Sequence, residues 1–298
     1  MKEKKMKPGK FKSQSRPYPV KAKKSLGQNF LQDEAIIESI IAIADVNLSD
    51  RIFEIGPGTG ALTTHLLEKA ASVTAVELDH DLVLRLGEIF KDSKGLSLLE
   101  GSVLEMDLSG YLLESGFEDG KFKVVANIPY YITAPIIRLL LSLPVRPERI
   151  VLMVQEAVAD RLAAGPGGMS LLSLMAQYYA DISKELFVPK TSFVPEPKVD
   201  SVVVRLVPKR VFSMDDDRSL FLIARAGFIA RRKTLANNLS SSFRIPRKEV
   251  ETMLGELLLD PLVRAQELSI EQWISLTQKV NSWEKAKAEE KAKAENEG

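Results

Sequence analysis

Short runs of apolar residues alternate, over the first two thirds of the chain, with longer stretches in which apolar residues recur every three or four positions. The short runs are rich in β-branched residues and predict strands, whereas the longer stretches predict amphipathic helices. This alternation indicates a mostly parallel sheet with helices on both faces. The predicted strands are 51–55, 72–76, 96–99, 123–126 and 149–154, and the predicted helices are 60–70, 79–91, 133–142, 155–163 and 170–180.

The pattern differs on either side of this alternation. Before it, apolar residues at helical spacing over 31–46, with Asp33 as the N-cap, predict one more helix. After it, strands near 184–188 and 201–207 are joined only by a Pro-rich loop, which predicts an antiparallel hairpin at the sheet edge. From residue 209 on, the pattern is helical only. The predicted helices there are 216–230, 233–240, 247–257 and 270–280.

These patterns predict an α/β fold: a Rossmann-like sheet, mostly parallel with an antiparallel edge hairpin, followed by a small all-α C-terminal domain. We expect a basic disordered tail over 1–24, an α/β domain over 25–208, a helical domain over 209–283 and a charged tail over 284–298. The first tail is rich in Lys and Pro without a hydrophobic period. The last is rich in Ala, Lys and Glu, which indicates either a frayed helix or disorder.

The composition excludes several kinds of chemistry. The chain has no cysteine and only two histidines, His65 and His80. A disulfide framework, a thiol nucleophile and an iron–sulfur cluster are therefore excluded, and we expect no metal site. No run approaches the roughly 18 apolar residues of a membrane span, and the N-terminus lacks the apolar region of a secretory signal. We therefore expect a cytoplasmic protein that does not bind membranes.

The net charge of +1 conceals an uneven distribution of charge along the chain. Residues 1–24 hold ten basic residues and one acidic residue, a net of +9, so the rest of the chain carries −8. A second basic cluster lies over 225–248, a stretch that contains no acidic residue. Its members are Arg225, Arg231, Arg232, Lys233, Arg244, Arg247 and Lys248. Basic patches on an acidic body suggest a polyanionic partner, although a solvated tail and a basic helix face explain the charge equally well.

A glycine-rich segment, EIGPGTGA over 54–61, joins the first predicted strand of the alternation to the helix that follows. Glycines let the backbone turn sharply and approach a ligand closely. Glu77 ends the next strand, 21 residues after Gly56, where a carboxylate can accept hydrogen bonds from both ribose hydroxyls of an adenosine cofactor. Gly56, Gly58 and Ala61 also satisfy the dinucleotide-binding fingerprint, so this segment alone leaves an NAD- or FAD-dependent enzyme open.

The tetrapeptide Asn127-Ile128-Pro129-Tyr130 follows the fourth of these strands. In a doubly wound sheet, the carboxyl end of such a strand faces the ligand crevice. The exocyclic amine of adenine is a poor nucleophile because its lone pair is delocalised into the ring. Hydrogen bonds to the Asn127 side-chain oxygen and the Ile128 carbonyl favour a more sp³-like nitrogen, and Tyr130 can stack on the base. No general base is needed before attack, which fits a chain without Cys and with two His.

Six segments together resemble the small-subunit (16S) ribosomal RNA adenine dimethyltransferase family, within the class I S-adenosylmethionine (SAM) methyltransferases. The resemblance covers roughly residues 24–276. The matching segments are KSLGQNFL (24–31), EIGPGTGALT (54–63), VELD (76–79), ANIPYYIT (126–133), FVPEPKVDS (193–201) and RRKTL (231–235). The resemblance implies a Rossmann-like methyltransferase whose 25–208 domain binds SAM and whose 209–283 domain binds RNA.

The resemblance also implies how the cofactor is held. Asn29 and Leu31 match the N-terminal segment that closes over SAM. Gly56, with Gly58 in the same loop, matches the glycines beneath the methionine part of SAM. Glu77 matches the acid on its ribose.

The resemblance further implies how the target base is held. Asn127 matches the family residue that touches both the cofactor and the target amine, and Tyr130 matches the stacking aromatic. Phe193 matches a second aromatic that would sandwich a flipped adenine. The family transfers two methyl groups to N6 of each of two adjacent adenosines in a hairpin loop near the 3′ end of 16S rRNA. Such a single-stranded loop allows its bases to be splayed out and recognised.

One position departs from the family pattern. The family usually carries Asp after the Gly that ends the third strand, where it binds the adenine amine of SAM, but this chain has Ser102. Serine can still form a hydrogen bond, although it lacks the charge and reach of Asp. Ser102 is therefore expected to bind the cofactor's adenine more weakly.

Two segments of the helical part favour the small-subunit family over its nearest alternative. That alternative is a 23S rRNA adenine N6-methyltransferase of the macrolide-resistance type, which shares the Asn-Ile-Pro-Tyr tetrapeptide. RRKTL over 231–235 and RAQELS over 264–269 resemble the small-subunit family more closely. We expect Arg231, Arg232 and Lys233 to bind 16S rRNA within a small-subunit precursor, and the enzyme to act as a monomer in ribosome biogenesis. A non-enzymatic assembly factor is disfavoured because Gly56 and Asn127 are retained.

Overall fold

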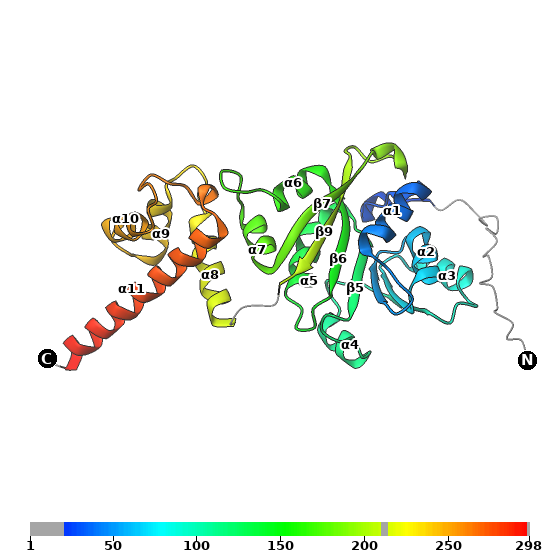
Figure 1. Ribbon diagram of the computed structural model, residues 1–298, viewed down its shortest axis with the longest axis horizontal. Helices are drawn as coiled ribbons and strands as arrows, with labels where there is room; N and C mark the ends of the chain where they lie inside the picture. Colours follow the sequence, from blue (N-terminus) through cyan, green and yellow to red (C-terminus); the bar gives the residue numbers. More distant parts are fainter. Residues whose placement is uncertain (1–20, 210–213, 297–298) are drawn as a thin grey trace, which may run out of the picture.

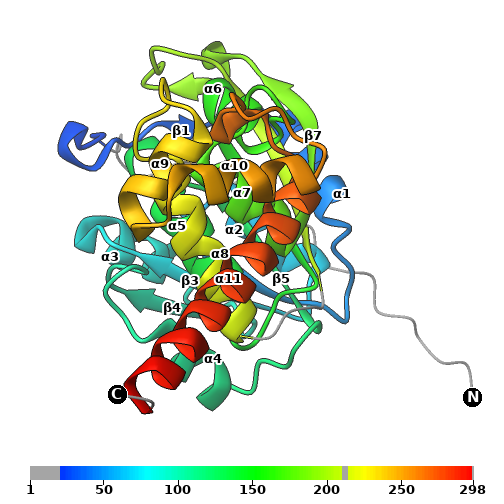
Figure 2. The same cartoon turned by 90° about the vertical axis from the view of Figure 1, so that its left-hand side faces the viewer.

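The computed structural model describes residues 21–209 and 214–296. Figure 1 shows an elongated molecule, in which an α/β unit occupies the centre and the N-terminal side and a smaller helical unit lies at the C-terminal end. Figure 2 looks along the molecule from the helical end and places the helical unit in front of the α/β unit. Among the described residues, none of the helices is both long enough and apolar enough to cross a membrane.

The α/β unit is built on a seven-stranded sheet. Its strands are β2 (Arg51–Ile55), β3 (Ser72–Glu77), β4 (Leu96–Glu100), β5 (Phe122–Asn127), β6 (Arg149–Gln155), β7 (Ala180–Val188) and β9 (Ser201–Pro208). Their order in the sheet is β4-β3-β2-β5-β6-β9-β7. β2 to β6 are parallel to their neighbours, whereas β9 is antiparallel to both β6 and β7. The predicted parallel sheet with an antiparallel edge hairpin is confirmed.

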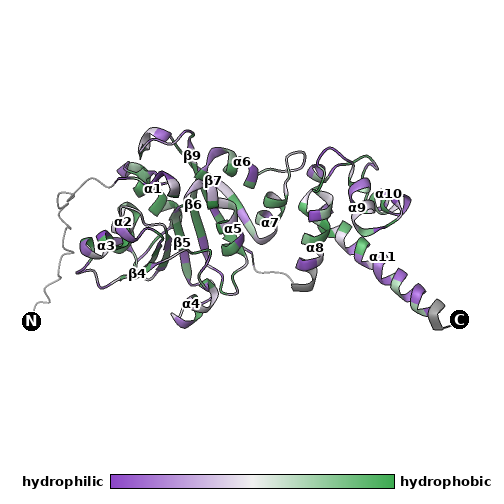
Figure 3. Cartoon of the chain, turned by 180° about the vertical axis from the view of Figure 1, so that it is seen from behind, coloured by the Kyte–Doolittle hydropathy of each residue, from purple (hydrophilic) through white to green (hydrophobic). Residues whose placement is uncertain are grey.

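Helices cover both faces of this sheet. They are α1 (Glu34–Ala44), α2 (Ala61–Lys69), α3 (His80–Ile89), α4 (Leu108–Glu114), α5 (Thr133–Leu141), α6 (Glu156–Leu162) and α7 (Leu171–Tyr179). Successive strand residues point to opposite faces, so Phe53 packs with α4 to α7 whereas Ile52 packs with α1 and α2. The predicted N-cap is confirmed, because the Asp33 side chain accepts hydrogen bonds from the backbone of Ala35 and Ile36. Figure 3 shows the hydrophobic residues concentrated on the strands.

The loop of the edge hairpin contains elements that the sequence pattern did not predict. It carries the short helix η3 (Lys190–Ser192) and the two-residue strand β8 (Phe193–Val194). β8 pairs with β1 (Phe30–Leu31), which lies near the N-terminus. This pairing ties the N-terminal segment to the hairpin loop and fixes its path next to the sheet.

The helical unit consists of α8 (Met214–Gly227), α9 (Leu235–Phe243), α10 (Arg247–Glu256), the short helix η4 (Ala265–Glu267) and α11 (Ile270–Asn296). Its hydrophobic cluster surrounds Trp273 and also includes Leu174 and Tyr178 of α7. The helical core therefore uses residues that precede the boundary expected at 208. α11 continues through the predicted charged tail to Asn296, and its last part is hydrophilic (Figure 3).

The basic N-terminal tail predicted over 1–24 lies outside the described residues except for its last four. Lys23 forms ion pairs with Asp79, at 2.6 Å, and with Asp81, at 2.7 Å. The short helix η1 (Lys24–Leu26) follows directly. The acidic start of α3 thus provides partners for the end of the basic segment.

Candidate functional site

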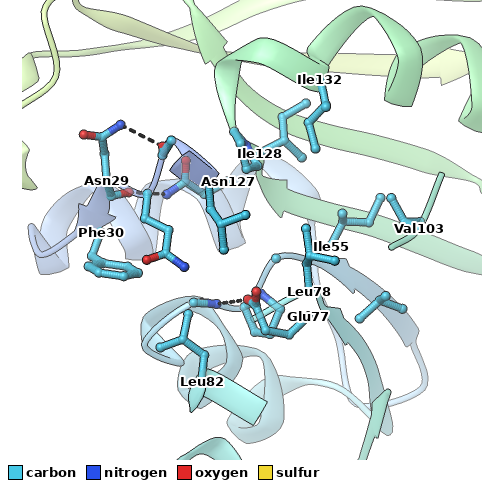
Figure 4. Close-up of a pocket in the computed structure, with 18 of the residues that line it drawn as sticks. Asn29, Phe30, Ile55, Glu77, Leu78, Leu82, Val103, Asn127, Ile128 and Ile132 are labelled. Carbon is cyan, nitrogen blue, oxygen red and sulfur yellow. Dashed lines mark hydrogen bonds between the residues drawn. The ribbon is translucent and has the colours of Figure 1, made fainter. Parts of the chain in front are cut away.

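A cavity lies at the carboxyl ends of β2, β3 and β5, and the segment that contains β1 forms one of its walls. All but one of the predicted catalytic and cofactor-binding residues line it. These are Asn29, Leu31, Gly56, Gly58, Glu77, Ser102, Asn127 and Tyr130. Figure 4 shows Asn29 and Asn127 beside each other, with Glu77 across the cavity. Residues from five separate segments of the sequence thus meet here, and four of these segments follow or end parallel strands of the sheet, where such a topology places a ligand site.

The glycine loop approaches the cavity with its backbone. Gly56, Gly58 and Gly60 all have positive φ angles, of 68°, 59° and 85°, a region that side chains other than hydrogen disfavour. A Cβ atom at Gly58 would lie only 3.3 Å from the Phe30 ring, so the loop and the N-terminal segment are in close contact. The loop therefore leaves backbone, rather than side chains, facing a ligand.

Glu77 is held by backbone donors on both sides. Its Oε2 accepts a hydrogen bond from the N–H of Gly58 at 3.0 Å, and its Oε1 accepts one from the N–H of Asp79 at 2.9 Å. Burial raises the pKa of the Glu77 carboxyl above its usual value, although the hydrogen bonds from Asp79, Gly58 and Leu78 oppose this shift. The carboxylate is thus fixed in place, where it can accept from the hydroxyls of a ribose.

This donor and acceptor set fits SAM. Gly56 and Gly58 offer a backbone that a bulky ligand can approach, and Glu77 offers the acceptor that a ribose needs. Apolar side chains such as Leu82 and Val103 line the same cavity and can cover an adenine. Among the described lining residues, Glu77 is the one carboxylate, so no Asp or Glu replaces the acid that the family usually has at the position of Ser102.

Asn127 and Tyr130 lie at the end of β5, where Pro129 interrupts the strand before the short helix η2 (Tyr130–Ile132). The Asn127 Nδ2 atom lies 3.5 Å from the carbonyl oxygen of Asn29, which leaves the side-chain oxygen as the acceptor of this amide. The Tyr130 hydroxyl is hydrogen-bonded to the Ser201 Oγ at 2.8 Å. Burial raises the pKa of Tyr130, so its phenol remains neutral. Ser201, the first residue of β9, therefore anchors the Tyr130 ring.

Phe193 is placed differently from the expectation. Its side chain is 2% exposed, and it packs with Leu31 in the hydrophobic cluster beneath α1 rather than lining the cavity. The antiparallel register explains this, because Leu31 pairs with Phe193 and directs both side chains into the core. Phe193 is therefore not among the residues that line the cavity, and its stacking on an adenine stays a prediction.

Arg231, Arg232 and Lys233 are exposed and form the turn between α8 and α9. The turn is supported by a hydrogen bond from the Lys233 N–H to the Ala230 carbonyl, at 2.9 Å. The side chain of Gln266 donates to the Arg231 carbonyl at 3.4 Å. These three cations therefore belong to the helical unit, separate from the cavity.

The sequence argument missed several residues that shape the cavity. Phe30 faces the glycine loop, and Tyr131, which is 58% exposed, packs against Gly27 at the rim. Gln28 and Asp79 are hydrogen-bonded to each other at 2.8 Å. All four lie within the segments that carry the family resemblance, so proximity to those motifs was the available signal.

Comparison with known proteins supports the same interpretation. A family model described as "Ribosomal RNA adenine dimethylase" matches residues 20–282. "Ribosomal RNA small subunit methyltransferase A" from Lactiplantibacillus plantarum is 40% identical over 265 residues, which cover 86% of this chain and 89% of that protein. The protein of the same name from Synechococcus elongatus is 42% identical, over 85% of this chain and 93% of its own length.

Two solved structures resemble most of this chain. A dimethyladenosine transferase from Plasmodium falciparum superimposes with a TM-score of 0.69 at 27% identity, over 85% of this chain and 97% of that one. The 23S rRNA methyltransferase ErmE superimposes with a TM-score of 0.68 at 24% identity, over 85% of this chain and 100% of its own. At that identity, the second comparison shows a shared fold only.

The sheet, the glycine loop and Glu77 together define a class I methyltransferase that uses SAM as its methyl donor. Within this class, the chain belongs to the ribosomal RNA adenine dimethylase family. The predicted fold, enzyme class and cofactor are thereby confirmed, and the NAD- or FAD-dependent alternative is wrong. The comparisons favour the small-subunit enzyme over the macrolide-resistance type.

Proposed function

We propose that this enzyme dimethylates N6 of two adjacent adenosines in the 3′-terminal hairpin loop of 16S rRNA, within a precursor of the small ribosomal subunit. The observation that carries the proposal is that Asn127 and Tyr130 line the same cavity as Gly56 and Glu77. The relatives' name, "Ribosomal RNA small subunit methyltransferase A", supports the choice of subunit.

The cavity divides into a cofactor part and a target part. Gly56, Gly58 and Glu77 would hold SAM, which supplies an electrophilic methyl group when it is bound. At the target part, the Asn127 side-chain oxygen and the Ile128 carbonyl accept hydrogen bonds from the adenine amine. These bonds localise the nitrogen lone pair and orient it, which is catalysis by positioning. The amine becomes acidic once it is alkylated, so its proton can pass to water without a dedicated base.

Tyr130 supplies the surface on which the target adenine stacks. Its hydroxyl is bound to Ser201 and its ring lines the cavity, so the ring is fixed before RNA arrives. An adenine must leave the base stack of its RNA to reach Tyr130 in the cavity, and this is easiest in a single-stranded loop.

The helical unit is proposed to bind rRNA through Arg231, Arg232 and Lys233. Their side chains are exposed, and the described residues give none of them an ion-pair partner. Exposed cationic side chains without an ion-pair partner can bind the phosphate oxygens of RNA. The monomeric state expected from the sequence is also a proposal.

The test is to incubate the enzyme with SAM and either 30S or 50S particles that lack the modification, and then to map the methylated nucleotide. We expect N6,N6-dimethyladenosine at two adjacent positions near the 3′ end of 16S rRNA, with 50S particles unmodified. Methylation of 23S rRNA would instead support the alternative enzyme type. Light scattering on the purified enzyme would test the monomer.

A further inference from the structure

The segment over residues 23–31, here called the strap, crosses the side of the cavity that faces the glycine loop. Its residues from Leu26 to Leu31 line the cavity. In Figure 4, Asn29 and Phe30 of the strap stand over the space between Asn127 and Leu82. The strap must therefore move before a cofactor of this size can enter or leave on that side.

We propose that Asp79 is a positioning residue that latches the strap shut and so sets how long the cofactor and its product stay bound. The proposal rests on the assignment of the cavity to SAM. It does not depend on which RNA is the substrate.

The latch is a small closed network. Asp79 accepts a hydrogen bond from Lys23 Nζ on Oδ1, at 2.6 Å, and one from Gln28 Nε2 on Oδ2, at 2.8 Å. The backbone N–H of Lys23 in turn donates to the Gln28 side-chain oxygen at 2.7 Å. One carboxylate thus holds both a charged and a neutral donor of the strap, and these donors are also tied to each other.

Asp79 is suited to this role because its carboxylate is buried while its lysine partner remains accessible. The Asp79 side chain is 2% exposed, whereas that of Lys23 is 43% exposed. Asp81 also pairs with Lys23, but its own side chain is 75% exposed. An exposed ion pair contributes little, whereas a charged hydrogen bond to a buried acceptor contributes more. Asp79 is therefore the stronger of the two attachments.

The latch is linked directly to the ribose-binding acid. The backbone N–H of Asp79 donates to Glu77 Oε1, while the Asp79 carboxylate holds the strap. Glu77 in turn accepts a hydrogen bond from the N–H of Gly58, and the Phe30 ring of the strap packs against Gly58. The strap, the glycine loop and Glu77 therefore form one connected unit around the cavity.

The other end of the strap is held by apolar packing. Leu31 is buried and pairs with Phe193 in the β1–β8 ladder. Opening at the β1 end would expose Leu31 and break a ladder. Opening at Asp79 replaces its hydrogen bonds to the strap with hydrogen bonds to water. We therefore expect the strap to open at Asp79 while its β1 end stays in place.

Asp79 also caps α3, because its Oδ1 accepts the N–H of Asp81 at 3.1 Å. A test must keep this cap. Asp79→Ser does so, since Ser is a good N-cap residue, but its short neutral side chain cannot hold Lys23 and Gln28. Lys23→Met removes the charged strap donor without touching α3. Asp81→Asn is the matched control, because it removes the exposed pair to the same lysine and leaves Asp79 in place.

The measurement is the rate of S-adenosylhomocysteine release from the full-length enzyme, by stopped-flow fluorescence or surface plasmon resonance. We expect Asp79→Ser to release it about tenfold faster, the scale of one charged hydrogen bond. Lys23→Met should do nearly the same, and the double variant should add little because both changes break one interaction. Asp81→Asn should change the rate less than about twofold.

A second measurement follows the strap itself. Trypsin cleavage after Lys24, quantified by mass spectrometry, should be several-fold faster in Asp79→Ser than in the wild type, with or without S-adenosylhomocysteine. Cleavage tests whether Asp79 holds the strap even if the protein fails to bind S-adenosylhomocysteine. Failure to bind that ligand would count against the cofactor assignment alone. Unchanged cleavage in Asp79→Ser would overturn the latch. So would faster ligand release in Asp79→Ser without any effect of Lys23→Met, because Asp79 would then act through Glu77 or α3.

Discussion

At the scale of single residues, the cavity contains side chains whose orientation is set by hydrogen bonds. Asn127 is oriented by the Asn29 carbonyl, and Tyr130 by Ser201. Glu77 is fixed by two backbone N–H groups. Under the proposed function, catalysis would rest on preorganised hydrogen bonds rather than on proton transfer, which agrees with the scarcity of His and the lack of Cys in the sequence.

The first prediction concerns Asn127. Asn127→Ala removes the side-chain acceptor for the target amine, and turnover on rRNA should fall by ~10²–10³, the scale for one preorganised polar contact. Affinity for S-adenosylhomocysteine, measured by calorimetry, should fall much less, because Glu77 and the glycine loop remain. Turnover close to that of the wild type would show that Asn127 does not orient the amine.

A second prediction uses Glu54, which is fully buried in β2 beneath the glycine loop. Thr63 Oγ1 donates to its Oε2 at 2.8 Å, and its Oε1 has no partner among the described residues. Burial raises the pKa of Glu54 from about 4.5 to about 8, the nearby charge of Glu77 adds to this, and the Thr63 hydrogen bond opposes it. The folded protein therefore keeps a proton at pH 7 that the unfolded chain has released.

The sign of the pH dependence follows from that proton. Between about pH 4.5 and 8 the folded state binds it and the unfolded state does not, so Glu54 makes the free energy of unfolding fall as pH rises. The slope is at most about 1.4 kcal/mol per pH unit, the value for one proton. Glu54→Gln should remove this contribution, which denaturant unfolding of both proteins from pH 5 to 8.5 would measure. Equal slopes for the two proteins would mean that Glu54 is ionised in the fold.

At the scale of elements, the pattern of apolar residues was sufficient to predict the strands at the centre of the sheet. β2, β3 and β5 were predicted to within one or two residues, because each is buried on both sides and ends at a motif. α4 was missed, since only Leu108 and Leu112 of its seven residues are buried. Two such residues give no recognisable period.

The β1–β8 pair could not be predicted for a different reason. Each strand has only two residues, and their partners are more than 160 positions apart in the sequence. No local pattern carries information about such a pairing. The same long-range contact places Phe193 in a buried environment, which the motif in the sequence could not indicate.

The third prediction concerns the turn between α8 and α9. A triple Arg231→Ala/Arg232→Ala/Lys233→Ala variant should bind 30S particles with a weaker salt dependence, since each lost phosphate contact lowers the slope of log K against log salt by ~0.7–0.9. Affinity for S-adenosylhomocysteine should not change, because the turn lies in the helical unit. An unaltered salt slope would mean that the turn is a solvated surface without an RNA contact.

At the scale of the whole molecule, the relation between the two units depends on the junction of α7 and α8. Asp217 of α8 accepts hydrogen bonds from the hydroxyls of Tyr178, at 2.8 Å, and Tyr179, at 3.0 Å, both in α7. The Phe221 ring packs against both tyrosine rings, with centroids 5.6 and 5.5 Å away. Burial, together with the hydrogen bond to Asp217, raises the pKa of Tyr179, so its phenol keeps the proton that it donates.

This junction joins the α/β unit, which holds the cavity, to the helical unit, which holds the turn with Arg231, Arg232 and Lys233. If the target adenine and the rRNA phosphates are bound at once, the two units must be held at a defined relative position. Asp217→Ala removes the acceptor of both phenols, and the free energy of unfolding should fall by about 1–3 kcal/mol, the cost of leaving such a buried group without its partner. Affinity for 30S particles should fall as well, whereas affinity for S-adenosylhomocysteine should not.

Two further variants separate the hydrogen bonds from packing. Tyr179→Phe keeps the ring and loses one bond, so it should lower 30S affinity less than Asp217→Ala does. Combining Tyr178→Phe and Tyr179→Phe with Asp217→Ala should add little to Asp217→Ala alone, because all three changes break the same pair of bonds. Chemical denaturation, together with equilibrium binding to 30S particles, measures both quantities. If Asp217→Ala lowers stability but leaves 30S affinity intact, the junction stabilises the fold without setting the position of the basic turn relative to the cavity.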